Sequence, residues 1–363
     1  MTARSDRLES PVRLPCGASL PNRIAKAAMT EGLSADGLPD IGHERLYRAW
    51  SRCGAGMMLT GNVQIARDHL ERPGNVVLDG EPDARTRAAF THWAAVAREG
   101  GARIWMQLSH AGRQTPSLIN PHPHAPSAVA LDLAPGRFGA PREMAKAEIE
   151  RVIAAFARAA RVARECGFDG VQIHAAHGYL ISTFLSPKAN RRGDRWGGPL
   201  ENRARLLLRT IAATRAAVGA DFPISAKLNS ADFQQGGFDF EESVTLAGWL
   251  ADAKVDLLEI SGGNYEQPSM MGLPGGPPMR FDAGPGGLFP RFRQGHAAGR
   301  DAAVDGHRRI SHRRGDDRGD RRGRGPRRRR PAALRRTRRP GEAAGRRARR
   351  AGPVRGTIAG RAA

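Results

Sequence analysis

The sequence predicts an α/β protein in which parallel strands and helices alternate along the chain. Three observations lead to this class. Short apolar runs alternate with amphipathic stretches over the first 288 residues, glycines such as Gly100, Gly167 and Gly219 stand where helices are expected to end, and polar residues follow the apolar runs. Strands that alternate with helices are typical of a parallel sheet with crossover connections. A chain of 363 residues suffices for one barrel of this kind or for two smaller domains.

Six apolar runs have the length and composition of buried strands. They are Arg23–Ala28, Met57–Thr60, Arg103–Leu108, Gly170–His174, Ile224–Leu228 and Leu257–Ser261. A closed (β/α)8 barrel, the TIM barrel, needs eight strand–helix units. The six units that we find therefore predict a TIM barrel that is incomplete in this chain.

Five amphipathic stretches are expected to form the helices between these strands. They are His43–Cys53, Asp83–Glu99, Ala145–Cys166, Leu200–Val218 and Phe240–Ala253. The third carries the clearest pattern, because its apolar residues recur at spacings of three and four. This spacing places them on one face of a helix, which we expect to be buried. The residues are Ile149, Val152, Ile153, Phe156 and Ala160.

Polar residues, with one glycine, cluster at or just after the carboxyl ends of the expected strands. They are Thr30, Glu31, Gly61, Asn62, Gln107, His110, Arg113, His174, His177, Tyr179, Lys227 and Asn229. A barrel enzyme places its chemistry at this end of its strands, and so does an open doubly wound sheet. No G-x-G-x-x-G motif follows the first strand, so a Rossmann nucleotide site is disfavoured.

The stretch from Gly167 to Arg205 holds the densest group of reactive side chains. His174 and His177 are three residues apart, and Tyr179 follows. Two histidines can donate hydrogen bonds to one carbonyl oxygen and stabilise the negative charge that develops there. A nearby tyrosine hydroxyl can deliver a proton. The alternatives are a zinc-binding pair of histidines on a helix, for which no third ligand is evident, and two structural histidines.

Several motifs resemble those of the old yellow enzyme family of FMN-dependent ene-reductases. The most specific are H-A-A-H-G-Y-L and then F-L-S-P-x-x-N-x-R-x-D-x-W-G-G and E-N-R, within Gly167–Arg205. NRIAKAAMT, QLSHAGRQ, ISAKLNSADF and LEISGGNYEQP resemble the segments at the first, third, fifth and sixth strands, although Ala28 stands where the family commonly has Pro. The resemblance covers roughly residues 10–288.

This resemblance implies a TIM barrel with FMN at the carboxyl-terminal mouth and NADH or NADPH as the reductant. Thr30 is expected near the reactive edge of the flavin, Gln107 at its pyrimidine ring and Lys227 beside its N1–C2 edge. A cation at that edge stabilises the anionic reduced flavin. The expected cofactor-binding residues are Ala28, Met29, Thr30, Gly61, Gln107 and Lys227.

The resemblance also implies a ping-pong reaction on an α,β-unsaturated aldehyde or ketone. His174 and His177 would hold the carbonyl oxygen of the substrate, flavin N5 would give hydride to Cβ, and Tyr179 would protonate Cα. These three residues are the expected catalytic residues. The flavin carries the redox step, while the protein supplies position and charge.

The segment from Phe289 to Ala363 differs in composition from the rest of the chain. It contains 25 Arg, no Lys and six acidic residues, so it carries +19 of the formal net charge of +22. Leu334 is its one leucine, and it shows no helical or alternating apolar period. We therefore expect residues 1–288 to form the FMN-binding barrel region and residues 289–363 to be a disordered tail. Because the charge belongs to one segment, a nucleic-acid partner is not expected of the body.

The family's FMN-phosphate motifs, a Gly-Gly loop after the seventh strand and a Gly-Arg step after the eighth, are not found after Leu288. Their absence leaves open a catalytically dead remnant that lacks the phosphate site. A second alternative is a protein that binds polyanions or nucleic acid through its Arg-rich tail.

The remaining sequence features favour a cytoplasmic protein with no membrane partner and no metal site. The opening MTARSDRLES is polar, and no apolar run approaches the roughly 18 residues of a transmembrane helix. Cys16, Cys53 and Cys166 lie far apart and suggest neither a disulfide framework nor an iron–sulfur cluster. A small-molecule enone or enal is the expected partner, and a homo-oligomer is possible.

A composition of Arg, Gly, Ala and Pro without Lys is what a GC-rich gene yields when it is read out of frame. We therefore hypothesise a frameshift near codons 284–292. We expect translation of one of the other two frames past that point to give a strand followed by a Gly-Gly loop. Two frames without such a strand would reject the frameshift.

Overall fold

The computed structural model describes residues 7–133, 136–266 and 303–306. Its centre is a parallel sheet with the strand order β12-β11-β10-β9-β6-β4-β3, and β5 pairs with β4 beside this path. Its strands are β3 (Ala25–Lys26), β4 (Met57–Gln64), β5 (Val76–Val77), β6 (Arg103–Ser109), β9 (Gly170–Ala175), β10 (Ile224–Asn229), β11 (Leu257–Ser261) and β12 (Ala303–Gly306). Among the described residues, the path ends at β3 and β12, so the α/β fold is that of an incomplete TIM barrel.

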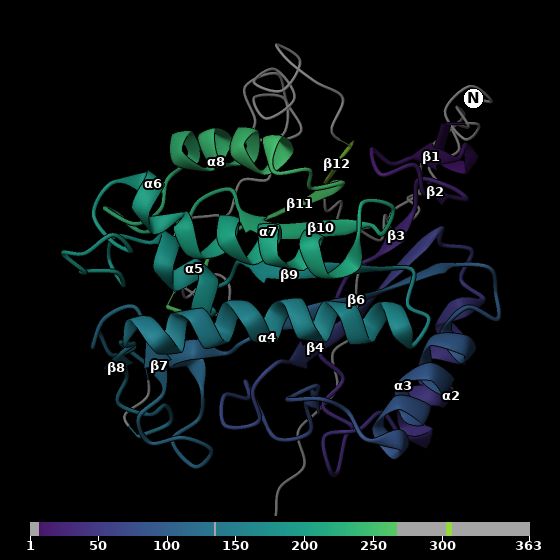
Figure 1. The fold of residues 1–363 in the computed structure, drawn as a ribbon, viewed down its shortest axis with the longest axis horizontal. Helices are drawn as coiled ribbons and strands as arrows, with labels where there is room; N and C mark the ends of the chain where they lie inside the picture. The colour runs from purple at the N-terminus through teal and green to yellow at the C-terminus, as the bar shows by residue number, and fades with distance from the viewer. Residues whose placement is uncertain (1–6, 134–135, 267–302, 307–363) are drawn as a thin grey trace, which may run out of the picture. The chain divides into compact units, whose positions relative to one another are not determined.

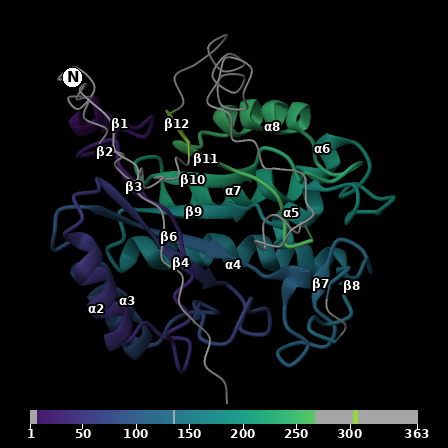
Figure 2. The same cartoon turned by 180° about the vertical axis from the view of Figure 1, so that it is seen from behind.

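The helices follow the strands in the order that the sequence predicts. They are α2 (Ile41–Ser51), α3 (Ala84–Ala97), α4 (Lys146–Glu165), α5 (Leu180–Leu185), α6 (Leu200–Arg203), α7 (Arg205–Val218) and α8 (Phe240–Asp252). Figures 1 and 2 show α4, α7 and α8 along one side of the sheet and α2 beside α3. Helix α4 buries the five apolar residues of its predicted stripe, which confirms the periodicity.

The structure differs from the predicted elements at several places. The first barrel strand is only two residues long, and Leu200–Val218 is two helices that break at Ala204 rather than one. Helix α5 and the short strands β5 and β12 were not predicted. The other unpredicted pieces are the pairs β1 (Val12–Arg13) with β2 (Ser19–Leu20) and β7 (His124–Ala125) with β8 (Arg142–Glu143), and the 3₁₀ turn η1 (Gly112–Gln114).

Strand β12 lies in the segment 289–363, where no element was predicted, and it pairs in parallel with β11. Apart from these four residues, the predicted disordered tail lies outside the described residues. The chain divides into two units, Met1–Arg309 and Ile310–Ala363, and the second unit lies outside the described residues altogether.

Apolar side chains fill the space between the helices and the sheet and also the amino end of the strands. The larger cluster joins the inner faces of the helices to the strands. A smaller cluster contains Leu14, Leu20, Met57, Trp105 and Leu257, so the β1–β2 hairpin packs against the amino ends of the strands. Gly170 is needed beside Trp105, because a Cβ at this position would lie 2.7 Å from the indole ring.

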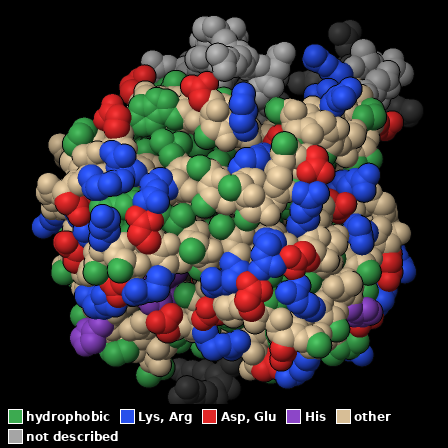
Figure 3. All heavy atoms as spheres, in the orientation of Figure 1, with side chains coloured by type: hydrophobic (Ala, Val, Ile, Leu, Met, Phe, Trp, Pro, Cys, Tyr) green, Lys and Arg blue, Asp and Glu red, His purple; other side chains and the backbone are tan. Residues whose placement is uncertain are grey.

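The surface of the first unit mixes charges of both signs. Figure 3 shows Lys and Arg side chains interspersed with Asp and Glu over the face that carries α4 and α7. The ion pairs there include Arg161–Glu165 and Arg209–Glu150, both at 2.5 Å. Exposed pairs of this kind contribute little to stability. Such a surface agrees with the small net charge of residues 1–288.

Asp256 fastens the amino end of the sheet to the N-terminal hairpin. One carboxylate oxygen accepts from the backbone N–H of Ile224 at 2.9 Å and from the Arg215 guanidinium at 2.7 Å. The other accepts from the backbone N–H of Cys16 at 2.8 Å. Asp256 is 2% exposed, so its removal would leave these donors buried without an acceptor.

We predict that Asp256→Ala lowers the free energy of unfolding by about 3–5 kcal/mol, the usual cost of removing one partner of a buried ion pair. Urea denaturation measures the change. Asp132→Ala is the matched control, because this aspartate is exposed, and it should change stability by less than about 0.5 kcal/mol. Equal losses in the two variants would show that Asp256 does not anchor the hairpin.

Candidate active site

The expected catalytic and cofactor-binding side chains meet at the carboxyl ends of adjacent parallel strands. In the strand register, Lys227 of β10 lies opposite His174 of β9, and Gln107 of β6 lies opposite Gln172 of β9. Asn62 of β4 lies opposite Gln107, just after a register shift in β4. Such shifts commonly re-aim side chains beside active sites. The predicted site therefore spans at least four strands.

His174 is a buried, neutral imidazole with a defined proton position. Its side chain is 3% exposed, and its Nδ1 accepts the backbone N–H of Ala176 at 3.2 Å. This hydrogen bond assigns the proton of the neutral ring to Nε2. Burial first, and then the nearby His177 and Lys227, hold the pKa of His174 well below 6.5. At neutral pH the residue is therefore a hydrogen-bond donor without a charge.

His177 lies beside His174 in a strained backbone conformation. Its φ is 63°, in the left-handed region that non-glycine residues rarely adopt. The side-chain oxygen of Asn229 accepts its N–H at 3.1 Å, and its Nε2 lies 2.5 Å from the hydroxyl of Ser261. The two imidazole centroids are 5.2 Å apart and their planes are inclined at 77°. The structure thus brings the predicted pair together.

The zinc alternative for this pair requires a third ligand. Among the described residues, the one group of three or more suitable side chains that lie close enough is His69, His110 and His124. That group does not include His174 or His177. The described part of the chain therefore offers the pair no third protein ligand.

Tyr179 completes the predicted group of three. It stands at the N-cap of α5, and its ring centroid lies 4.8 Å from that of His174. The hydroxyl donates to Oε2 of Glu71 at 2.5 Å and lies 2.7 Å from the hydroxyl of Tyr265. Burial, followed by the charge of Glu71, raises the pKa of Tyr179 well above 10. Its proton is therefore retained across the physiological pH range.

Gln107 and Lys227 are joined by two buried polar residues that sequence reasoning missed. Nε2 of Gln107 donates to Gln172 at 2.6 Å, and Nε2 of Gln172 donates to Glu259 at 2.9 Å. Glu259 in turn lies 3.0 Å from Nζ of Lys227. Strand alternation could have found both residues, because Gln172 precedes His174 by two positions and Glu259 precedes Ser261 by two.

The segment after β3 lies against Gly61 of β4. A Cβ at Gly61 would lie 2.7 Å from the carbonyl oxygen of Met29, and the N–H of Gly61 donates to Glu31 at 3.0 Å. The Met29 side chain is exposed, and Ala28 and Thr30 are half-buried. These expected cofactor-binding residues therefore form one wall beside β4.

Comparison with known proteins decides the family. The model of the NADH:flavin oxidoreductase / NADH oxidase family matches residues 10–268. The chain belongs to this family. Its flavin oxidoreductases use NADH, which agrees with the expected flavin and reductant. The residues after Leu288, where the family's FMN-phosphate motifs are not found, lie outside the described residues apart from β12.

Relatives in this family are about 40% identical to the chain over the aligned residues. An NADH-dependent flavin oxidoreductase from Hypocrea jecorina is 40% identical over 278 residues, which cover 72% of this chain and 69% of that protein. A protein of the same name from Neonectria sp. is 41% identical over 276 residues, or 72% of this chain and 36% of the relative. The chain thus spans from about a third to about two thirds of the length of these two relatives.

Solved structures of the family share the fold. An old yellow enzyme homologue from Zymomonas mobilis superimposes with a TM-score of 0.68 at 27% identity, covering 84% of this chain and 82% of that one. A morphinone reductase in complex with tetrahydroNAD gives 0.65 at 26% identity over 79% and 77% of the two chains. No helix among the described residues of this family member is long and apolar enough to cross a membrane.

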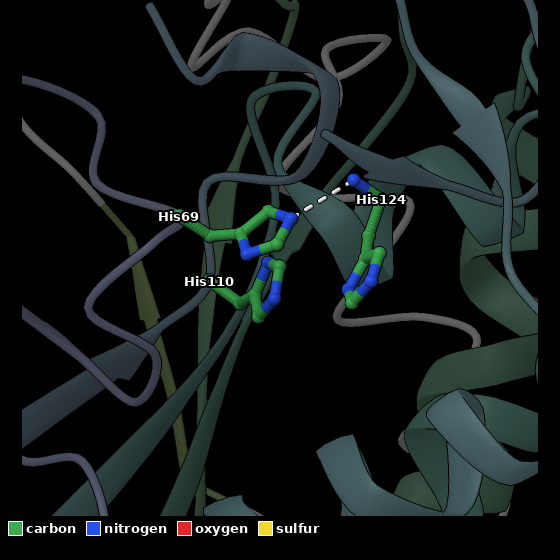
Figure 4. A group of neighbouring side chains, drawn as sticks. All are labelled: His69, His110 and His124. Carbon is green, nitrogen blue, oxygen red and sulfur yellow. Dashed lines mark hydrogen bonds between the residues drawn. The ribbon is translucent and has the colours of Figure 1, made fainter. Parts of the chain in front are cut away.

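A second histidine cluster consists of His69, His110 and His124. His69 and His124 stack with centroids 4.3 Å apart, and His110 lies 4.3 Å from His69 (Figure 4). Nδ1 of His69 lies 2.7 Å from the carboxylate of Asp68, and its Nε2 accepts the backbone N–H of His124 at 2.9 Å. Nδ1 of His110 accepts the N–H of Gly112 at 3.1 Å.

These bonds use both ring nitrogens of His69 within the protein. Stacked rings also cannot aim their in-plane lone pairs at one shared point as metal ligands must. The three histidines therefore act as a polar brace. This brace joins the connection after β4 to the end of β6 and to β7.

The brace makes stability depend on pH. The pKa of His110 lies well below 6.5 because of burial and then of His69, and burial followed by His69 lowers the pKa of His124 to about 4. An unfolded chain takes up a proton at these positions near pH 6.5, while the folded chain takes none at His124 until about pH 4. Lowering the pH from 7 to 5 therefore favours unfolding.

We predict that His124→Gln weakens this dependence, so that less stability is lost between pH 7 and pH 5 than in the parent. Urea denaturation at pH 7, 6 and 5 measures it. His122→Gln is the matched control, because His122 is exposed and should keep the parent slope. A parent slope in His124→Gln would contradict the assigned cause.

Proposed function

We propose that this protein is an NAD(P)H-dependent FMN oxidoreductase that reduces the activated C=C bond of α,β-unsaturated ketones and aldehydes. The observation that carries the proposal is the group of His174, His177 and Tyr179, with ring centroids 4.8–5.2 Å from His174. Its position at the carboxyl ends of the strands, beside Gln107 and Lys227, supports a reaction next to a bound flavin.

The described residues fit the polar edge of a flavin. Gln107 offers an amide that both donates and accepts, as the pyrimidine ring requires. Lys227 offers a cation that is 4% exposed, where a negative charge on the reduced ring would be stabilised. The side-chain oxygen of Asn62 is buried without a hydrogen-bond partner in the described residues, so β4 presents a further unused polar atom at this end.

The wall of Ala28, Met29, Thr30 and Gly61 would contact the ring system. Gly61 allows this close approach, because the carboxylate of Glu31 and the carbonyl oxygen of Met29 leave no room for a Cβ. FMN, when bound, supplies the hydride for Cβ of the substrate and accepts a hydride from NADH or NADPH. Two relatives are named NADH-dependent, so NADH is the reductant to test first.

His174 would activate the substrate through its Nε2–H. A carbonyl oxygen that accepts this proton donor, together with His177, gains stabilisation as it develops negative charge. The low pKa of His174 means that the donor is neutral and keeps its proton. The strained backbone of His177 and its bonds to Asn229 and Ser261 hold the second ring in place, so little reorganisation is needed during the reaction.

Tyr179 would complete the reduction by protonating Cα. Its burial excludes water from the position of the proton donor, and its place at the N-cap of α5 fixes the ring against His174. General acids placed in this way contribute about 10²–10⁴-fold in rate. The reaction then adds one hydride and one proton across the double bond.

The first test is the visible spectrum of the purified chain after FMN addition and desalting. A retained flavin band that NADH bleaches without oxygen and cyclohexenone restores would support the proposal. His174→Ala should slow the restoration by about 10²–10³-fold, the cost of losing one oxyanion donor. His122→Ala is the exposed control and should restore the band at the parent rate.

A colourless parent protein would overturn the proposal for this chain. It would favour a remnant without flavin, or a protein whose function lies in the binding of polyanions by its Arg-rich segment. A yellow protein that NADH bleaches and oxygen alone restores would keep the flavin oxidoreductase and reject the enone as its substrate.

A further inference from the structure

The hydroxyl of Tyr179 belongs to a hydrogen-bonded group of four side chains. It lies 2.5 Å from Oε2 of Glu71 and 2.7 Å from the hydroxyl of Tyr265. The side-chain amide of Asn62 also donates to Oε2 of Glu71. One carboxylate oxygen thus accepts two hydrogen bonds directly beside the proposed proton donor.

The fold assembles this group from distant parts of the chain. Glu71 lies in the connection between β4 and β5, 108 residues before Tyr179, and Tyr265 follows β11, 86 residues after it. The backbone N–H of Glu71 donates to Oδ1 of Asn75 at 3.1 Å. Hydrogen bonds to both its backbone and its carboxylate therefore fix the position of Glu71.

The two partners differ in their access to water. Tyr179 is 3% exposed, while Glu71 is half-buried. A phenol enclosed in this way exchanges its proton with water slowly unless another group carries it. Glu71 contacts the phenol and is itself partly exposed, so it offers the connection between Tyr179 and solvent.

Tyr179 cannot remain without its proton after it has protonated a substrate. A phenolate in this place would be buried and would lie beside the Glu71 carboxylate, and both conditions disfavour the charged form. The direction of the pKa shift of Tyr179 agrees with this geometry. The phenol must therefore be restored as it is used, by a group within hydrogen-bond distance.

We propose, on the basis of the function proposed above, that Glu71 in its acid form resupplies the proton that Tyr179 delivers to Cα. The Tyr179 O–H bond breaks as the Cα–H bond forms, and the Glu71 O–H bond breaks as the phenol O–H bond is restored. The carboxylate then takes a proton from water. The relay carries protons only, and the two electrons of the reduction reach Cβ with the hydride.

The direction of one hydrogen bond distinguishes the two states of the relay. When Glu71 is ionised, Tyr179 must donate its proton to the carboxylate and holds it away from a substrate. When Glu71 is protonated, the acid donates to the phenol oxygen, and the phenol proton is free to point elsewhere. Glu71 is thus a positioning residue that acts through Tyr179.

The other titratable and charged groups around the pair are less suited to this role. His174 contacts the ring of Tyr179, but as a neutral Nε2–H donor it is committed to the carbonyl oxygen. Tyr265 is a second phenol, and burial followed by Glu71 raises its pKa above 10. Arg72 and Arg137 act on Tyr265 as cations, and a guanidinium is not a proton donor in proteins.

A measurement on the protein without added flavin tests the hydrogen bond itself. The chain has three tyrosines, so ¹³Cζ-tyrosine labelling gives three signals that Tyr→Phe variants assign. We expect the Tyr179 signal to shift in Glu71→Gln, which alters the hydrogen bond to the hydroxyl. The signal should keep its parent position in Glu201→Gln, an exposed control.

A measurement on the flavin-loaded protein tests the relay. We expect Glu71→Gln to leave bleaching by NADH within about twofold of the parent and to slow recolouring by cyclohexenone about 10-fold or more, within the range of proton-transfer catalysis. The parent should recolour faster at lower pH and with a solvent deuterium effect, and Glu71→Gln should lose that pH dependence. Glu71→Asp, which keeps a transferable proton, should recover part of the rate.

The outcomes separate the two proposals. A parent that recolours with cyclohexenone while Glu71→Gln recolours equally fast overturns the relay and leaves the enone reductase standing. A parent that does not recolour overturns the reductase, and with it the relay as a part of that reaction. A Tyr179 signal that is unchanged by Glu71→Gln overturns the relay whatever the flavin shows.

Discussion

The parallel register of β6, β9, β10 and β11 holds every part of the candidate site in place. Each strand contributes side chains from alternate positions, so a slip by one residue would turn its polar set from the inner to the outer face. Lys227 lies opposite His174 only in the observed register. The apolar packing below, around Trp105 and the β1–β2 hairpin, therefore acts on the chemistry indirectly, because it holds the strands that set this alignment.

Two layers of polar side chains depend on this register and have different functions. The inner layer connects Gln107, Gln172, Glu259 and Lys227 in one buried chain of hydrogen bonds and an ion pair. A buried lysine without an acceptor would be costly, so Glu259 allows the cation to be kept close to the sheet. It also offsets part of the field that Lys227 exerts on a neighbouring negative charge. The second layer, with His174, His177 and Tyr179, stands at the strand ends, where a substrate can be reached.

The regular parts of this arrangement could be predicted from the sequence, and the long-range contacts could not. Period and alternation identify a helix or strand locally, which is why the α4 stripe and the six strand positions were found. The break between α6 and α7 at Ala204 cannot be recognised from the apolar pattern of the sequence. Short local motifs also located His174 and Tyr179, because they follow one strand.

Glu71 and Tyr265 could not be found in this way. Each meets Tyr179 only because loops after different strands converge, and nothing in the sequence near Glu71 shows which hydroxyl it will contact. Strand alternation places Gln172 on the same face as His174 and Glu259 on the same face as Ser261. Both residues nevertheless precede the strand ends, where reactive residues are expected. Contacts between distant segments need the fold itself.

Burial acts on His174 and Tyr179 through the same physical cause and gives them complementary roles. In both cases the charged form is disfavoured, so the imidazole stays neutral and the phenol keeps its proton. A neutral imidazole is suited to hold a developing oxyanion. A phenol with a raised pKa is by itself a weak acid, and it becomes an effective proton donor only if its conjugate base is never left uncompensated. Glu71, whose Oε2 lies 2.5 Å from the hydroxyl, would meet that requirement in its acid form, because it can neutralise the phenolate as it forms and recover its own proton from water.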